Sequence, residues 1–157
     1  MNWINYLEIN EKYIGDELRE KCILFVFLYM QLNSYCNDKY GKKTSEHCKM
    51  VDRLSSNTKL KQAYTSIDIE EKFINTFSNI LLNGVVREYV IDMKRTKNKK
   101  YFNNHNNQLQ NFLDVIYQIR CNMFHGSKSP YEDRNIKLIA WAYDCLNELL
   151  KNSGLLD

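Results

Sequence analysis

The stretch IRCNMFHG, residues 119–126, closes the clearest amphipathic helical pattern in the chain. A helix that starts at Leu109 would carry a single apolar face made of Leu109, Phe112, Leu113, Ile116, Ile119, Met123 and Phe124. At about 100° per residue, Arg120 falls near the middle of that face. Because an unpaired buried guanidinium is strongly unfavourable, Arg120 needs a buried partner, or a face that opens onto a cleft or a second subunit.

The residues that follow this stretch predict another helix with a clear start. Ser129 has the character of an N-cap, Pro130 suits the first helical position, and Glu132 completes a capping box. We expect this helix to run from Tyr131 to about Lys151. Its apolar face would consist of Ile136, Ile139, Ala140, Tyr143, Leu146 and Leu150.

A long helix is expected near the start of the chain, from Asp16 to about Tyr40, ended by Gly41. Its apolar face would consist of Leu18, Cys22, Phe25, Tyr29, Leu32 and Cys36. The apolar run at residues 22–30 is too short for a membrane span, which needs about twenty residues, so we expect a buried helix segment there.

The remaining helices are less sharply patterned. We expect helices over residues 3–14, 44–54 and 69–82, whereas residues 55–68 keep helical spacing without a clear assignment. Residues 85–91 have the composition of a strand, but we favour a helix because a lone strand would have no pairing partner. Residues 94–107 have the character of an exposed loop.

Composition supports a single helical domain over residues 1–157. The chain is 44% hydrophobic and 26% charged, and one proline with five glycines leaves few turn signals. We therefore predict an all-α fold, an up-and-down bundle of about four to six helices. The five widely spaced cysteines, with no signal peptide, are typical of reduced thiols in a cytoplasmic protein.

The pair Arg120 and His125, with polar Asn122 between them and Gly126 directly after, resembles the Arg-x4-His signature of the HEPN superfamily (higher eukaryotes and prokaryotes nucleotide-binding domains). The resemblance covers roughly the last third of the chain. It implies a HEPN-like helical fold, and many members are RNases of toxin–antitoxin, CRISPR and anti-phage systems. The chain departs from the pattern at Cys121, where members often have Asn, Asp or His, and at Ser127, where one toxin subgroup has tyrosine.

On a straight helix, Arg120 and His125 would lie about 140° apart around the axis and about 7.5 Å apart along it. They would not meet on one face. Either the helix ends at His125 and Gly126 lets the backbone turn, or two copies of the motif face each other across a two-fold axis. The resemblance implies the second arrangement, a homodimer with a composite active site.

The resemblance also implies a reaction, RNA cleavage by attack of the ribose 2′-hydroxyl on the adjacent phosphorus, with no metal and no cofactor. His125 suits either proton-transfer role, and Arg120 suits phosphate binding and stabilisation of growing negative charge. Asn122 would hydrogen-bond the phosphate or orient His125. The expected products are a 2′,3′-cyclic phosphate and a free 5′-hydroxyl.

A basic run precedes the motif helix and contains Lys94, Arg95, Lys97, Lys99 and Lys100. Together with its neighbouring aromatic residues it could hold an RNA backbone and stack a base, and Lys128 would join that contact. A solvated loop is the alternative, and for a charge run alone the more common one.

Three functions are compatible with these residues. The first is a cytoplasmic endoribonuclease of a bacterial toxin or anti-phage system, with RNA, a second copy and an antitoxin or regulatory protein as partners and no membrane contact. The second is a non-catalytic HEPN module that binds a partner protein or nucleotide through a dimer surface. In the third, a helical adaptor, Arg120 and His125 only hold the bundle together. A metal site at His47 and Cys48 is disfavoured because further ligands are missing.

Overall fold

The computed structural model describes residues 16–66, 89–91, 99–101, 108–124 and 133–157. These residues form the predicted all-α bundle. Its elements are helices α2 (Asp16–Tyr40), α3 (Thr58–Ser66), α5 (Gln108–Phe124) and α6 (Asp133–Ser153), the π-helix η2 (Cys48–Arg53), the 3₁₀ turn η3 (Leu54–Ser56), and two three-residue strands, β1 (Tyr89–Ile91) and β2 (Lys99–Tyr101). The helices expected over residues 3–14 and 69–82 and the capping box at 129–132 lie outside the described residues.

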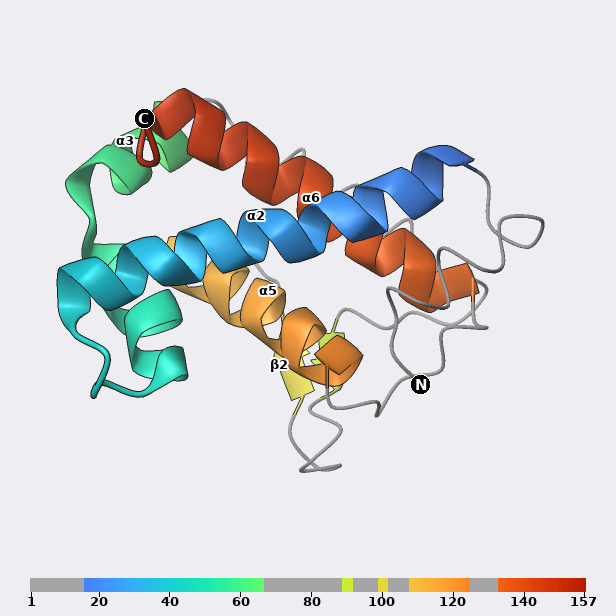
Figure 1. Cartoon of the computed structure of the whole chain (residues 1–157), viewed down its shortest axis with the longest axis horizontal. Helices are drawn as coiled ribbons and strands as arrows, with labels where there is room; N and C mark the ends of the chain where they lie inside the picture. Colours follow the sequence, from blue (N-terminus) through green and yellow to red (C-terminus); the bar gives the residue numbers. More distant parts are fainter. Residues whose placement is uncertain (1–15, 67–88, 92–98, 102–107, 125–132) are drawn as a thin grey trace.

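The three long helices make up most of the bundle. α2 and α6 run in the same direction and pack along each other, while α5 runs in the opposite direction beside them (Figure 1). Lys21 on α2 links the first two by donating a hydrogen bond of 2.9 Å to Asp144 on α6. The site described below lies on α5, on the side where η2 packs.

Helix α2 has the predicted bounds. It ends before Gly41, whose φ of +89° suits glycine and whose amide donates to the carbonyl of Asn37 at 3.0 Å. Of the predicted face, Cys22, Phe25, Tyr29, Leu32 and Cys36 are buried and Leu18 is partly buried.

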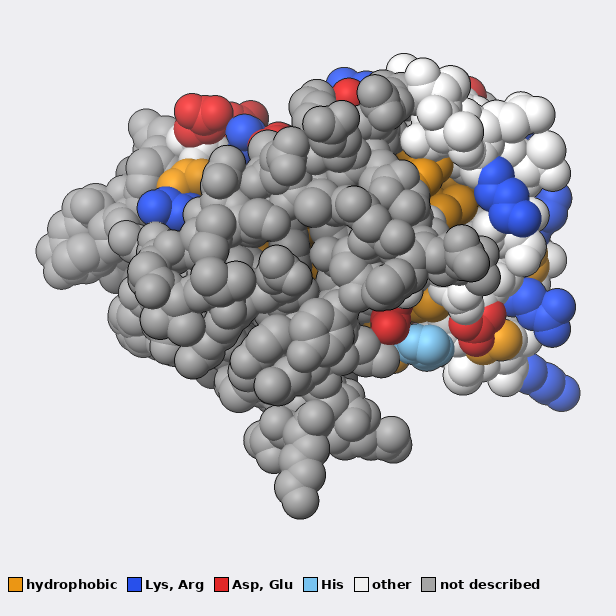
Figure 2. All heavy atoms as spheres, turned by 180° about the vertical axis from the view of Figure 1, so that it is seen from behind, with side chains coloured by type: hydrophobic (Ala, Val, Ile, Leu, Met, Phe, Trp, Pro, Cys, Tyr) orange, Lys and Arg blue, Asp and Glu red, His pale blue; other side chains and the backbone are white. Residues whose placement is uncertain are grey.

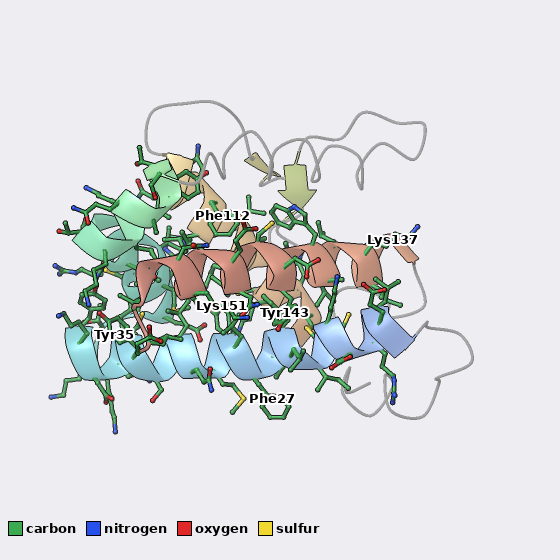
Figure 3. The ribbon with its side chains drawn as sticks, turned by 90° about the horizontal axis from the view of Figure 1, so that it is seen from above. Phe27, Tyr35, Phe112, Lys137, Tyr143 and Lys151 are labelled. Atoms are coloured by element: carbon green, nitrogen blue, oxygen red, sulfur yellow. The ribbon has the colours of Figure 1, made fainter. Side chains whose placement is uncertain are left out.

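The expectation that the whole apolar run at residues 22–30 is buried is wrong. Phe27 and Met30 are 55% and 59% exposed, and Leu24 is also exposed. A helix turns about 100° per residue, so nine consecutive residues point in every direction and one packed face cannot cover them all. Phe27 points away from the bundle, whereas Phe112 lies among the helices (Figure 3).

Phe112 on α5 is fully buried and lies in the core between helices. Its ring lies 6.0 Å from that of Tyr64 on α3 and 6.2 Å from that of Trp141 on α6, measured between ring centroids. One side chain therefore connects three helices. The predicted α6 face is also confirmed, since all its members are buried except the partly buried Tyr143.

The segment between α2 and α3 is built by local polar contacts. The Ser45 hydroxyl accepts a hydrogen bond of 3.2 Å from the Cys48 amide, and Asn57 caps α3 by accepting 3.1 Å from the Leu60 amide. The buried Lys49 ammonium donates to the Asn37 side chain on α2. These contacts hold η2 between α2 and α5.

The preference for a helix over residues 85–91 is wrong for its last three residues. Tyr89–Ile91 form β1, which pairs antiparallel with β2 in the register Tyr89–Tyr101, Val90–Lys100 and Ile91–Lys99. The partner that the sequence did not reveal is therefore part of the basic run, and both strands lie against α5. Among the described helices, none is both long enough and apolar enough to cross a membrane.

Burial makes three of the cysteines part of the core. All five cysteines are free thiols, and Cys22, Cys36 and Cys145 are buried. Removal from water raises the pKa of Cys22 to about 12 and that of Cys36 to about 11. Both thiols are therefore poor nucleophiles and behave as small apolar side chains.

We predict that Phe112→Ala lowers the free energy of unfolding by about 3–5 kcal/mol, because it removes a fully buried ring and leaves a cavity between three helices. Urea unfolding followed by circular dichroism measures the change. Phe27→Ala is the matched control, and its exposed ring should cost less than about 1 kcal/mol. Equal losses in the two variants would contradict the assignment of Phe112 to the core.

Candidate functional site

Arg120 has a charged and partly buried partner, Glu46. Its Nη1 lies 3.1 Å from Oε2 of Glu46, and both side chains are about a quarter exposed, at 23% and 25%. The guanidinium carbon also lies 5.5 Å from the centroid of the Tyr29 ring on α2, a cation–π distance. The charge is thus held between α2, α5 and the turn before η2, and still reaches solvent.

The placement of Glu46 follows from the local sequence. Gly41 ends α2, and the chain then turns so that η2 packs on α5. Glu46 begins the short helical segment that continues into η2, one residue after Ser45, whose hydroxyl accepts a hydrogen bond from the Cys48 amide. Tyr29 is supplied by the buried face of α2. Three segments distant in sequence therefore meet around one guanidinium.

Asn122 lies on another side of α5. Only 4% of the residue is exposed, and its Oδ1 accepts a hydrogen bond of 2.9 Å from Nε2 of Gln118. Two residues along the helix from Arg120, it is about 200° away around the axis. The structure does not bring Asn122 to the Arg120 guanidinium, and a role for it at a phosphate stays a prediction.

Most of the other predicted site residues cannot be located. His125, Lys94, Arg95, Lys97 and Lys128 lie outside the described residues. Lys99 and Lys100 belong to strand β2, which lies against α5, although only their backbone is described. The described part of helix α5 extends to Phe124, the residue before His125.

A second polar contact lies next to the Arg120 ion pair. Nε2 of His47 lies 3.0 Å from Oδ1 of Asp114, and the imidazole meets the ring of Tyr117 edge-on, with 5.0 Å between centroids and 83° between planes. We call Glu46, His47, Asp114, Tyr117 and Arg120 the polar cluster. Figure 2 shows a histidine side chain at the surface between acidic side chains.

The two tyrosines at this site are protonated phenols at neutral pH. Burial raises the pKa of Tyr29, and the nearby Glu46 carboxylate raises it further while the Arg120 guanidinium opposes the shift. Burial also raises the pKa of Tyr117, with a contribution from the neighbouring Cys121 thiol. Neither phenol therefore supplies a negative charge that would compete for Arg120.

Sequence reasoning identified Arg120 but missed the other members of the polar cluster. Asp114, Tyr117 and Arg120 follow one another at intervals of three residues on α5, and this spacing is visible in the sequence. Their partners Glu46 and His47 come from a segment more than 60 residues upstream, and no local pattern links the two. Among the described residues, no group of three His, Cys, Asp or Glu side chains is arranged to hold a metal ion.

Comparison with known proteins adds no relative. No protein-family model matches the chain, and no curated protein or solved structure is significantly similar to it. The function is therefore argued from the polar cluster and from the motif.

We predict that Arg120 and Glu46 are energetically coupled. In a double-mutant cycle with Arg120→Met and Glu46→Gln, the unfolding free energies should show a coupling of about 0.5–3 kcal/mol, because each single change leaves a partly buried charge without its partner. Urea unfolding of the four proteins gives the coupling. The exposed pair Gln110 and Asp52, which also links α5 to η2, is the control and should couple by less than about 0.5 kcal/mol. Additive effects of Arg120→Met and Glu46→Gln would contradict the ion pair.

Proposed function

We propose that this protein is a metal-independent endoribonuclease of the HEPN type, which cleaves RNA by 2′-hydroxyl attack and leaves 2′,3′-cyclic phosphate ends. The observation that carries the proposal is the state of Arg120. Its guanidinium lies on the apolar face of α5, about one turn before Phe124, the last described residue of that helix, and its side chain remains 23% exposed. A charge in such a place is costly to keep, which favours a functional reason for it.

The chemistry of Arg120 suits a phosphodiester. The guanidinium is planar and always charged, and its parallel N–H groups match two phosphate oxygens. The guanidinium carbon lies over the Tyr29 ring, 5.5 Å from its centroid. In the free protein Glu46 pairs with the guanidinium, and because that carboxylate is itself a quarter exposed, an incoming phosphate can replace it.

The Tyr29 hydroxyl supports the same interpretation. Tyr29 is only 3% exposed, and its hydroxyl oxygen has no hydrogen-bond partner among the described residues. Buried polar groups are normally paired, so an unpaired hydroxyl beside a guanidinium calls for an explanation. A phosphate oxygen bound by Arg120 would supply an acceptor.

Proton transfer is assigned to His125 by the resemblance. As a base, its imidazole takes the 2′-hydroxyl proton, and as an acid it delivers a proton to the leaving 5′-oxygen. Arg120 stabilises the charge that grows on the phosphate oxygens. Strand β2, which carries Lys99 and Lys100 of the basic run, lies against the motif helix, and this contact supports an RNA-binding role for that strand.

The proposed oligomeric state, cellular role and regulatory partner also come from the resemblance. They are a homodimer whose two motifs form one composite site, a cytoplasmic role as a bacterial toxin or anti-phage nuclease, and an antitoxin or regulatory protein that restrains it. Two copies would bring a second Arg120 and a second His125 to the same RNA strand.

A second candidate is a non-catalytic HEPN module that binds a partner protein or nucleotide through a dimer surface. The Arg120–Glu46 ion pair favours it, since a guanidinium that is already paired with Glu46 and in cation–π contact with Tyr29 can serve the fold alone. In that case cleavage is absent and partner binding depends on other surface residues.

We predict that the wild-type protein cleaves end-labelled RNA in the presence of EDTA and that His125→Ala lowers the rate by about 100-fold or more, the usual contribution of a proton-transfer residue. Arg120→Ala should be at least as damaging. Arg120→Lys should also be strongly impaired, because lysine keeps the charge but loses the bidentate geometry. Gel analysis of the products and of their cyclic-phosphate ends measures these effects.

Gln110→Ala, a polar change on the same helix outside the polar cluster, is the control and should cleave like wild type. Cleavage that persists in both Arg120→Ala and His125→Ala would contradict the proposal. Failure of the wild type to cut any RNA would leave the binding module as the better candidate.

A further inference from the structure

The contact between His47 and Asp114 has the form of a catalytic dyad. The Asp114 carboxylate lies 3.0 Å from Nε2 of the imidazole, and a carboxylate can only accept, so Nε2 carries the hydrogen in this contact. In the neutral ring the other nitrogen, Nδ1, is then the acceptor. The carboxylate also stabilises the imidazolium that forms when Nδ1 takes a proton.

The imidazole is both fixed and accessible. Its edge-on contact with Tyr117 and its hydrogen bond to Asp114 restrict the ring at two neighbouring positions on one face of α5. The side chain is nevertheless 43% exposed, and no described residue makes a hydrogen bond to Nδ1. A fixed imidazole with a free acceptor at the surface can exchange a proton with a bound molecule.

The dyad lies beside the Arg120 guanidinium. His47 directly follows Glu46, which is paired with Arg120 at 3.1 Å, and Tyr117 is one helical turn from both Asp114 and Arg120. Along α5, Asp114 and Arg120 are about 9 Å apart. A phosphate that displaces Glu46 from Arg120 would therefore bring its ribose close to the imidazole of the next residue.

We propose that His47, oriented by Asp114, is a further proton-transfer residue of the RNA-cleaving site around Arg120, and that it takes the proton of the attacking 2′-hydroxyl. The inference rests on the proposed endoribonuclease function. The 2′-oxygen forms its bond to phosphorus as Nδ1 of His47 takes the 2′-hydroxyl proton, and the bond from phosphorus to the 5′-oxygen breaks as His125 gives that oxygen a proton. No oxidation occurs, and water restores both imidazoles to their starting protonation.

This assignment gives the reaction a proton acceptor in addition to the proton donor that the resemblance implies. Cleavage through the 2′-hydroxyl needs one group to accept a proton and another to donate one. The dyad supplies the acceptor on the described side of α5, and His125 of the motif is the donor under the proposed function. Asp114 acts through His47 and is therefore a positioning residue.

The test is cleavage of a dinucleotide such as uridylyl-3′,5′-adenosine under steady-state conditions with EDTA. His47→Gln keeps a side-chain N–H that can donate to Asp114 but cannot transfer a proton, and should lower kcat by about 100-fold or more while KM changes less than about threefold. Asp114→Asn keeps the shape but loses the charge, and should lower kcat by about 10-fold or more. Gln110→Ala is again the control and should keep both constants.

A second measurement does not depend on turnover. In the wild-type protein, cytidine 3′-monophosphate should shift the His47 ring resonance in a histidine-selective NMR spectrum, and Arg120→Met should abolish that shift. An unmoved His47 resonance, or a kcat within about twofold of wild type in His47→Gln, would overturn the inference.

The two proposals fail in different ways. If the wild type cuts and His125→Ala does not, while His47→Gln cuts normally, only the role of His47 is rejected. If the wild type itself cuts no RNA, the proposed function is rejected and the role of His47 with it.

Discussion

A charge on an apolar helix face is the constraint on which the organisation of this molecule depends. Arg120 interrupts the buried face of α5, and its guanidinium is tolerated because Glu46 pairs with it and Tyr29 lies beneath it. For Glu46 to pair with Arg120, the segment that follows α2 lies on α5, and η2 packs against the same helix. His47 directly follows Glu46, and Asp114 lies six residues before Arg120 on α5. The same arrangement therefore brings His47 and Asp114 together.

The parts of the fold that follow from local chemistry could be predicted. α2 ends where predicted because Gly41 follows it, and α5 covers the predicted apolar pattern from Leu109 because the helical spacing is sustained. The predictions of secondary structure and burial were wrong where tertiary contacts determine the outcome. Tyr89–Ile91 form a strand because a short segment of the basic run pairs with them, and Phe27 and Met30 stay exposed because α2 packs on one side only. Neither outcome is visible in a local sequence window.

The candidate site was predictable to a similar extent. Arg120 stands out by itself, since the helical period alone puts a charge where apolar side chains belong. Glu46 and His47 could not be found in the same way, because they lie more than 60 residues away and have no motif of their own. Asn122 was a candidate because of its position in the motif. In the folded chain its side chain is buried and accepts a hydrogen bond from Gln118. The motif therefore indicates the helix, and the tertiary structure selects which polar residues share its accessible side.

Our central proposal is that Arg120 binds an RNA phosphate and that, in the free protein, the Glu46 carboxylate occupies the position of that phosphate. The most direct test is the affinity of Glu46→Gln for a 2′-O-methyl RNA oligonucleotide, which cannot be cleaved, measured by fluorescence anisotropy at fixed salt. Our account predicts severalfold tighter binding than wild type, a smaller gain in Asp52→Asn, which removes an equal charge from the same side of α5, and a loss of binding in Arg120→Met. Equal affinity in the wild type, Glu46→Gln and Arg120→Met would contradict it and would show that Arg120 serves only the fold.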